Sequence, residues 1–245
     1  MERLKGKVAF ITGSGDGIGR EAARLFAEEG AKVVIAELSP ENGEATVDMI
    51  RERGGEAVFI ATDVTEPRVV EEALKLTISN YGRLDILYNN AGGSTRNDGP
   101  VTTASLDEFW RVIKLDLFGT IVCSRFAIPY MRASGGGAII NTTSIVARMG
   151  LVGRDFYTAA KGGIVSLTRS MAVEFAPDKI RVNAVAPNVA KTDRVAKLMA
   201  GDPTAKITEG INPLGPGLPI DVAYAALYLA SDESRMTTGH ILPAS

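Results

Sequence analysis

Seven short apolar runs alternate along the chain with longer segments that mix apolar and charged residues. The runs occupy residues 7–11, 32–36, 56–61, 85–88, 137–141, 180–185 and 240–242. Apolar runs separated by helix-length segments are typical of strands that alternate with helices in a parallel sheet. Because crossovers between parallel strands are right-handed, the helices then cover both faces. The pattern predicts an α/β fold with a doubly wound parallel sheet of about seven strands.

A glycine-rich turn at residues 12–19 follows the first predicted strand and leads into an amphipathic helix that ends at Gly30. Glycines bring the backbone close to a ligand, and the unpaired N–H groups of a helix N-terminus attract an anion. A bare glycine motif can be only a tight turn, but the flanking strand and helix favour a Rossmann-like pyrophosphate site. The candidate cofactor-binding residues of this turn are Gly13, Asp16, Gly17, Ile18 and Gly19.

Glu37 ends the second predicted strand, where an acidic side chain can bind the adenosine ribose hydroxyls of a dinucleotide. A carboxylate there repels a 2′-phosphate, and Leu38 beside it supplies no positive charge. We therefore expect NAD rather than NADP as the cofactor. The alternative is that Glu37 is only an exposed charge at the end of a strand.

Ser144, Tyr157 and Lys161 form a candidate catalytic set. Ser144 follows the fifth predicted strand, and Tyr157 and Lys161 are spaced to share one face of a helix. A lysine cation lowers the pKa of a nearby phenol from about 10, which suits the phenol to general acid-base catalysis. The Ser144 hydroxyl could hold a substrate oxygen. Taken alone, the Tyr-x-x-x-Lys spacing is also typical of an amphipathic helix with a half-buried tyrosine.

The composition is that of an ordinary globular protein, with 45% hydrophobic and 23% charged residues among 245. No linker-like stretch divides the chain, so we expect a single domain over residues 1–245. The net charge of −2 and the scattered basic residues argue against a nucleic-acid partner. The sequence has no apolar run of membrane-spanning length and no apolar leader, which predicts a cytoplasmic protein with no membrane partner.

The single cysteine and the single histidine exclude several kinds of site. One cysteine can form no intrachain disulfide, and its apolar neighbours predict that Cys123 is a small core residue. One histidine, His240, cannot complete a Ser-His-Asp triad or a histidine-rich metal site within one chain. We expect no metal.

Several motifs together resemble the short-chain dehydrogenase/reductase family over essentially the whole chain. They are the glycine turn, Asn89-Asn90-Ala91-Gly92, Ser144 and the Tyr157-x-x-x-Lys161 pair. The resemblance implies that the segment after the third strand flanks the adenine of NAD, and that the loop after the sixth strand meets the nicotinamide. The cofactor-binding residues implied in this way are Leu38, Asp63, Val64, Asn90, Ala91, Gly92, Tyr157, Lys161, Pro187, Val189 and Thr192.

The resemblance also implies an NAD(H)-dependent oxidoreductase that interconverts a secondary alcohol and a ketone, a small-molecule substrate pair. Tyr157 would exchange the proton with the substrate oxygen, Ser144 would orient that oxygen, and Lys161 would tune Tyr157 and bind the nicotinamide ribose. The alternative is a non-catalytic dinucleotide sensor or scaffold, because a fold does not establish chemistry. A nucleotide-sugar epimerase shares the Tyr-Lys pair but needs a larger C-terminal substrate region, so we do not expect one.

Two positions depart from the family pattern near the site. Asp116 stands where relatives commonly have an asparagine that holds a proton-relay water. A carboxylate accepts but does not donate hydrogen bonds, and it attracts the Lys161 cation, so Asp116 is a fourth candidate catalytic residue whose relay role is open. Asn188 replaces a glycine; because asparagine tolerates positive φ well, we expect the turn to be kept.

The expected substrate lid lies at about residues 190–215. Arg148, Arg154 or Arg194 could bind an anionic substrate group, although surface salt bridges are the commoner role of such arginines. The family resemblance implies a homotetramer, or a dimer, that pairs long helices at about 104–131 and 154–176. Apolar side chains on these helices suit an interface or the monomer core equally: Phe109, Trp110, Phe118, Ile164 and Leu167.

Overall fold

The computed structural model describes residues 2–200 and 214–244, and its described strands form one parallel sheet. The sheet order is β3-β2-β1-β4-β5-β6-β7. The direction of winding reverses between β1 and β4, which opens a crevice beyond the carboxyl ends of the strands. The predicted fold class is confirmed. The strands are β1 (Val8–Thr12), β2 (Lys32–Glu37), β3 (Glu56–Ala61), β4 (Ile86–Asn89), β5 (Gly137–Thr142), β6 (Ile180–Pro187) and β7 (Ile241–Ala244).

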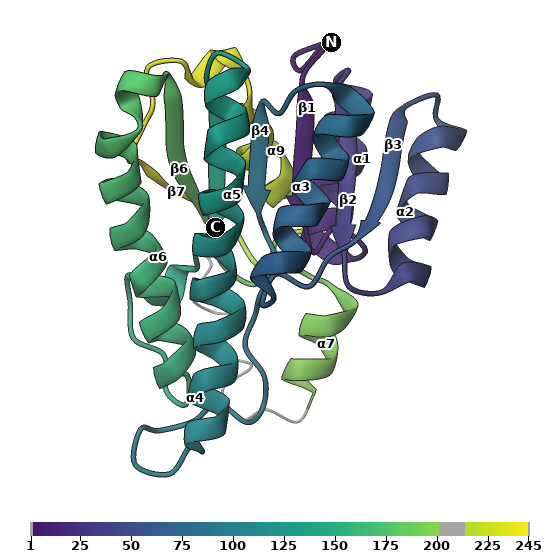
Figure 1. Cartoon of the computed structure of the whole chain (residues 1–245). Coiled ribbons are helices and arrows are strands. Elements are labelled where there is room, and N and C mark those ends of the chain that lie inside the picture. The colour runs from purple at the N-terminus through teal and green to yellow at the C-terminus, as the bar shows by residue number, and fades with distance from the viewer. Residues whose placement is uncertain (1, 201–213, 245) are drawn as a thin grey trace.

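Helices cover both faces of the sheet, as Figure 1 shows with α3, α5 and α6 in front and α1 and α9 behind. Most of the core is correspondingly divided between one apolar cluster under α1, α2 and α9 and another under α3, α5 and α6. The helices are α1 (Gly17–Glu28), α2 (Pro40–Glu52), α3 (Pro67–Tyr81), α4 (Leu106–Val112), α5 (Gly119–Ala133), α6 (Asp155–Glu174), α7 (Asp193–Met199) and α9 (Pro219–Ala230), with short 3-10 turns at Ile145–Ala147, Ala176–Asp178 and Asp232–Ser234.

The strands read as continuous apolar runs because both of their faces are buried. In β1, Phe10 packs into the cluster under α3, α5 and α6, while Ile11 packs into the cluster on the opposite face. In β2, Val34 and Ile35 divide in the same way. Each fully buried side chain of this kind contributes about 1.5–3 kcal/mol to folding. This two-sided burial holds the strand ends, and therefore the site, in fixed register.

The long helix predicted at about 104–131 is interrupted. After α4, the residues Ile113–Phe118 form a π-helical turn before α5 begins at Gly119. A π turn holds an extra residue, which rotates the side chains that follow it, and such turns are frequent at functional sites. Here the turn places Asp116 in the interior, fully buried. The second long helix is continuous as predicted and runs over Asp155–Glu174.

The apolar residues considered for a subunit interface lie in different surroundings. Trp110 is 64% exposed and Phe118 is 37% exposed, whereas Ile164 is fully buried. Leu167 packs against the core cluster under α6, and the Phe109 ring makes an edge contact with Phe156. Only Trp110 and Phe118 of these five therefore present a substantial apolar surface.

Candidate active site

A cavity of about 490 Å³ opens at the carboxyl ends of the central strands. Most of the residues predicted for the site line it, although they come from separate segments of the chain. Gly19 and Asp116 are the two that do not. Those that line the cavity are Gly13, Asp16, Gly17, Ile18, Glu37, Leu38, Asp63, Val64, Asn90, Ala91, Gly92, Ser144, Tyr157, Lys161, Pro187, Val189 and Thr192.

The glycine turn needs its glycines for two different reasons. Gly13 and Gly17 adopt φ of +62° and +52°, a backbone region that favours glycine. Gly19 instead packs against the chain itself, because a Cβ at that position would lie 2.1 Å from the Gly13 carbonyl oxygen. Asp16 begins α1, its carboxylate accepting a 2.7 Å hydrogen bond from the Gly17 N–H. Gly19 therefore shapes the turn from outside the cavity.

The Glu37 carboxylate is held in place by backbone N–H groups. One oxygen accepts a 2.9 Å bond from Gly15, and the other accepts bonds of 2.9 and 3.1 Å from Leu38 and Ser39. A Cβ on Gly15 would lie 2.6 Å from the Glu37 side chain, so the turn and the acid approach closely. Glu37 is therefore a positioned acceptor on the cavity wall rather than a loose charge at a strand end.

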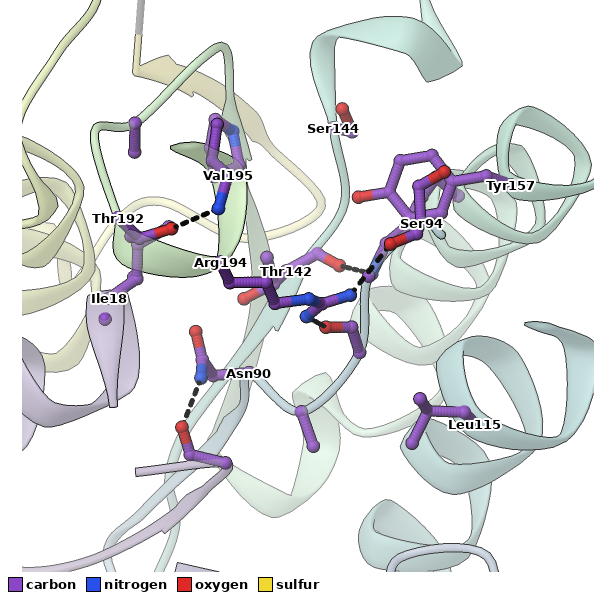
Figure 2. A pocket seen from close by; sticks show the side chains of 18 of the residues that line it. Ile18, Asn90, Ser94, Leu115, Thr142, Ser144, Tyr157, Thr192, Arg194 and Val195 are labelled. Carbon is purple, nitrogen blue, oxygen red and sulfur yellow. Dashed lines mark hydrogen bonds between the residues drawn. The ribbon is translucent and has the colours of Figure 1, made fainter. Parts of the chain in front are cut away.

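The ends of β1 and β4 are joined at the floor of the cavity. The Thr12 hydroxyl accepts bonds of 3.0 Å from the N–H groups of Asn90 and Ala91. The Asn90 amide donates in turn to the carbonyls of Thr12 and Gly13, and Figure 2 draws one of these two bonds. This link fixes the segment that leads from Asn90 to Gly92.

The loop after β6 crosses to the glycine turn. Thr192 caps the start of α7 by accepting a 3.1 Å bond from Val195, and its methyl group lies 3.1 Å from the place that a Cβ on Gly17 would take. Asn188 does not adopt the positive φ considered from the sequence, since Lys179 alone does so among the non-glycine residues described. The turn at Asn188 therefore keeps ordinary backbone geometry. Of the predicted lid, residues 201–213 lie outside the described part of the chain.

Tyr157 and Lys161 share one face of α6, as their spacing predicts. The Lys161 ammonium lies 5.5 Å from the centre of the Tyr157 ring and donates a 2.8 Å bond to the Thr142 carbonyl. Ser144 follows β5 in an extended conformation and lies next to Tyr157 in Figure 2. The Thr143 hydroxyl donates a 2.8 Å bond to the Lys161 carbonyl, which ties α6 to the end of β5. The arrangement places two hydroxyls and one cation together.

Asp116 forms a buried ion pair with Lys161. Its Oδ1 lies 2.9 Å from the Lys161 Nζ, and the two side chains are 0% and 2% exposed. The same oxygen accepts a 2.8 Å bond from the Gly93 N–H, so the carboxylate also holds the loop after β4. The other oxygen, Oδ2, is buried and has no hydrogen-bond partner among the described residues. Asp116 thus acts on the site from behind its wall.

Burial and neighbouring charges act on the Tyr157 phenol in opposite directions. Burial raises its pKa, Lys161 and Arg194 lower it, the Asp116 carboxylate raises it, and a hydrogen bond with Ser144 lowers it. The net direction is upward, so the acidifying effect expected of Lys161 is present but is outweighed in the protein alone. For Lys161, burial lowers the pKa, but the Asp116 carboxylate contributes to a net rise that keeps the ammonium charged.

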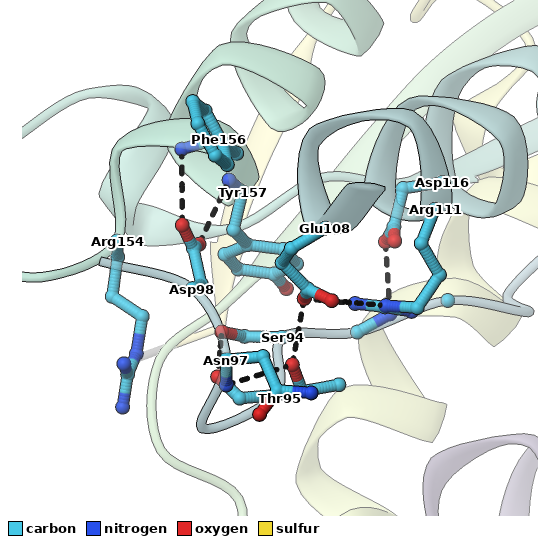
Figure 3. Close-up of polar contacts among 12 residues, drawn as sticks. Ser94, Thr95, Asn97, Asp98, Glu108, Arg111, Asp116, Arg154, Phe156 and Tyr157 are labelled. Carbon is cyan, nitrogen blue, oxygen red and sulfur yellow. Dashed lines mark hydrogen bonds and ion pairs between the residues drawn. The ribbon is translucent and has the colours of Figure 1, made fainter. Parts of the chain in front are cut away.

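Asp98 is a site residue that the sequence did not indicate. Its carboxylate accepts bonds of 3.2 Å from the Phe156 N–H and 3.0 Å from the Tyr157 N–H (Figure 3). It thereby caps the first turn of α6 and fixes the backbone that carries the phenol. No local pattern could reveal this, because the capping carboxylate comes from a loop far away in the sequence. Next to it, Glu108 accepts bonds from Thr95 and Arg111.

Two further expectations concern the single cysteine and a metal site. Cys123 is buried, and burial raises the pKa of its thiol to about 12, as suits a core residue. Across residues 2–200 and 214–244, no group of three or more histidines, cysteines or carboxylates is arranged to hold a metal ion.

Within the described part of the chain, none of the helices has the length and apolar character needed to cross a membrane.

Comparison with known proteins identifies the family. A family model described as enoyl-(acyl carrier protein) reductase matches residues 13–245. The chain is 40% identical to the uncharacterized oxidoreductase YxbG of Bacillus subtilis (strain 168), with 100% of this chain and 91% of that protein covered. The chain belongs to the short-chain dehydrogenase/reductase family. The expected family and the expected class, an oxidoreductase acting on CH–OH groups, are confirmed.

Two relatives of this short-chain dehydrogenase/reductase are named for their substrates. One is cis-4-hydroxycyclohexanecarboxylate dehydrogenase of Sinomonas cyclohexanicum, which is 39% identical over 98% of this chain and 96% of that protein. The other is a solved structure of 7α-hydroxysteroid dehydrogenase complexed with NADH and 7-oxo glycochenodeoxycholic acid. That structure is 34% identical in sequence and has a TM-score of 0.92. The match covers 98% of this chain and 93% of that chain.

Proposed function

We propose that this protein is an NAD(H)-dependent oxidoreductase that interconverts a secondary alcohol and a ketone. The observation that carries the proposal is the convergence of Ser144, Tyr157 and Lys161 on the wall of the same cavity as the glycine turn and Glu37. A dinucleotide site and a proton-transfer site therefore share one space. The named relatives that act on secondary hydroxyl groups support the same reaction.

The residues along the cavity suit NAD. The glycine turn forms a cradle that a Cβ would fill, since one on Gly13 would lie 2.9 Å from Ala91. At the far end, Glu37 offers fixed acceptor oxygens for ribose hydroxyls and repels a 2′-phosphate. Asp63 and Thr192 line the same space. When bound, NAD supplies a carbon that accepts hydride from the substrate in one direction and donates it in the other.

Tyr157 carries the proton in the proposed mechanism. In alcohol oxidation its phenolate takes the hydroxyl proton as the carbinol carbon loses hydride, and in ketone reduction the phenol returns that proton to the oxygen. Ser144 holds the same oxygen by a hydrogen bond and keeps it beside Tyr157. The charged Lys161 stabilises the phenolate and offers a donor to the nicotinamide ribose.

Asp116 is a positioning residue in this scheme. Its ion pair keeps Lys161 charged and in place, and its bond to the Gly93 N–H fixes the loop after β4. The same carboxylate raises the pKa of Tyr157, so it opposes part of the effect of Lys161. This arrangement favours the protonated phenol, which is the form that ketone reduction consumes.

Turnover separates the proposed enzyme from a dinucleotide sensor. Because the two relatives are named for ring-borne hydroxyl groups, the assay uses cyclic and acyclic secondary alcohols with NAD, and NADH formation is followed by absorbance. We expect turnover that is lost in Tyr157→Phe while NAD binding is kept. NAD binding without turnover of any alcohol or ketone would favour the sensor.

The oligomer and the cellular location stay predictions. A homotetramer, or a dimer, is supported by exposed apolar residues on α4, α5 and α6, such as Trp110, Ile121 and Val173, which are 64%, 40% and 79% exposed. Analytical ultracentrifugation of the wild type and of Trp110→Ser tests it; a wild-type monomer would contradict it. Cell fractionation tests the expected cytoplasmic location.

A further inference from the structure

The charged residues that line the cavity are divided between its two ends. Asp16, Glu37 and Asp63 lie at the end of the glycine turn and of β2 and β3. The cations of the described lining are Lys161, Arg154 and Arg194, which come from α6, its start and α7, at the end of the cavity that holds Tyr157. Lys161 is already paired with a buried carboxylate. Among the described residues, the reactive end therefore carries positive charge, and none of the carboxylates in the described lining lies there.

Arg194 is the cation whose charge is least compensated. Its guanidinium points from the first turn of α7 across the cavity toward Ser94 and Tyr157 (Figure 2). It donates to the carbonyls of Gly92 and Ser94, the latter at 3.0 Å. Both partners are uncharged, and Arg194 forms no ion pair with any residue in the described ranges. Its charge is close enough to lower the pKa of Tyr157.

A carboxylate is a better partner for Arg194 than two backbone carbonyls. A guanidinium has five N–H donors in a planar fork, and it binds a carboxylate by two parallel charge-assisted hydrogen bonds of about twice the neutral strength. Apolar side chains also line this end of the cavity, and they suit a hydrocarbon framework that joins a carboxylate to the reacting hydroxyl group. The apolar lining residues at this end include Leu115, Val146, Leu151, Val195 and Leu198.

We propose that Arg194 binds a carboxylate of the substrate, so that the enzyme selects secondary alcohols in which an apolar framework carries a carboxylate group. The inference rests on the proposed alcohol dehydrogenase function and adds a substrate class to it. Arg148 is not part of the lining, and the Arg154 side chain is directed away from Tyr157 in Figure 3. Of the three arginines, Arg194 is therefore the one placed to bind a carboxylate in the cavity.

Arg96 provides a matched control, because it lies in the loop after β4 and contacts α7, whereas Arg194 lies in α7 and contacts that loop. It donates to the carbonyls of Lys197 at 2.6 Å, Leu198 at 3.3 Å and Ala200, at the end of α7. Arg96 and Arg194 therefore both fasten α7 to the loop after β4, but Arg96 does not line the cavity. Replacing either arginine removes the same charge and loosens the same helix, and only Arg194 would remove a substrate contact.

The experiment compares wild type, Arg194→Gln, Arg194→Lys and Arg96→Gln. Each is assayed with 4-hydroxycyclohexanecarboxylate and its carboxamide, and with an acyclic hydroxy acid and its amide. In wild type we expect kcat/KM to favour a carboxylate at least about tenfold, mainly through KM. Arg194→Gln should abolish this preference, Arg194→Lys should keep part of it, and Arg96→Gln should keep it entirely.

A binding measurement makes the outcome independent of turnover. Calorimetry of the NADH-saturated enzyme compares the binding of cyclohexanecarboxylate with that of cyclohexanecarboxamide. Wild type should bind the carboxylate more tightly, and Arg194→Gln should lose this preference. Equal binding of the two probes to wild type would overturn the proposal. An equal loss of the carboxylate preference in Arg96→Gln would also overturn it. So would a fall in NAD affinity in Arg194→Gln as large as the fall in carboxylate affinity, because that result would assign the guanidinium to a cofactor phosphate. Turnover of the amides alone would leave the dehydrogenase function intact and refute the carboxylate site.

Discussion

The two ends of the cavity are held together in different ways. At the glycine-turn end, backbone N–H groups make the key contacts: the Glu37 carboxylate accepts bonds from Leu38 and Ser39 beside it and from Gly15 in the turn. At the reactive end, the contacts join distant segments: Asp116 to Lys161, Asp98 to Tyr157, and Arg194 to Gly92. One end depends on a glycine turn and a single acid, and the other on charged side chains from several separate segments.

This difference predicts different consequences of mutation. A backbone cradle with an acid on the cavity wall sets cofactor affinity and selectivity, because its polar groups meet the ligand directly. A buried network of paired charges acts on two properties at once. It sets the pKa of the reacting group, and it affects the stability of the fold because each charge lost its hydration on burial. Substitutions at the two ends should therefore separate into binding effects and coupled effects on pH dependence and folding.

The largest expected effect is at the phenol. Tyr157→Phe removes the only proposed proton carrier, and general acid-base catalysis is worth about 10²–10⁴-fold, so kcat for alcohol oxidation should fall by that factor. NAD affinity, measured by fluorescence titration, should change little. Tyr224→Phe is the control, since Tyr224 is 55% exposed and does not line the cavity. Comparable activity of the Tyr157 variant and wild type would remove the phenol from the mechanism.

Asp116→Asn tests whether the buried pair couples stability to pH dependence. Breaking a buried ion pair from one side costs about 3–5 kcal/mol, which urea denaturation would detect. Since Asp116 raises the pKa of Tyr157, its removal should extend alcohol oxidation to lower pH, because the phenolate forms more readily. A displacement of the pH profile to higher pH would indicate instead that Lys161 loses its proton with its partner. Lys114→Gln, at an exposed ion pair, should leave the profile unchanged.

At the other end, Glu37→Gln should change cofactor selectivity rather than pH dependence. Like charges brought together cost several kcal/mol, so removing the carboxylate should improve NADP relative to NAD by about tenfold or more. The ratio of kcat/KM for the two cofactors measures this. Glu41→Gln, an exposed acid in the first turn of α2, is the matched control. An unchanged ratio would mean that Glu37 does not meet the ribose.

The smallest expected effect is at the cap of α6. Asp98→Ala removes two hydrogen bonds to N–H groups of the first turn, and losing such a cap costs about 1 kcal/mol. The melting temperature should fall by a few degrees, and kcat should fall modestly because the Tyr157 backbone is less well fixed. Asp48→Ala, on the exposed side of α2, should stay within about 0.5 kcal/mol of wild type. Equal melting of the two variants would show that the cap adds nothing.

Much of the fold and part of the site follow from local patterns. The strand runs, the glycine turn before α1 and the face shared by Tyr157 and Lys161 all depend on spacing over a few residues, and the structure has them as predicted. The predictions that the structure changed concern properties that a residue's tertiary surroundings determine. The sequence suggested a net acidic shift of Tyr157, but burial, which no motif encodes, reverses its direction.

By itself, the sequence determined which segments form strands and helices, which backbone turn can cradle a phosphate, and which hydroxyls and cation end up beside the crevice. Periodicity and residue type suffice for these features because neighbours in sequence are neighbours in space. The tertiary structure alone decided that a π turn buries Asp116 against Lys161, that Asp98 caps α6 and that Arg194 reaches over the loop after β4. These contacts join residues far apart in the chain, and only the packing of the sheet and its helices brings them within hydrogen-bond distance.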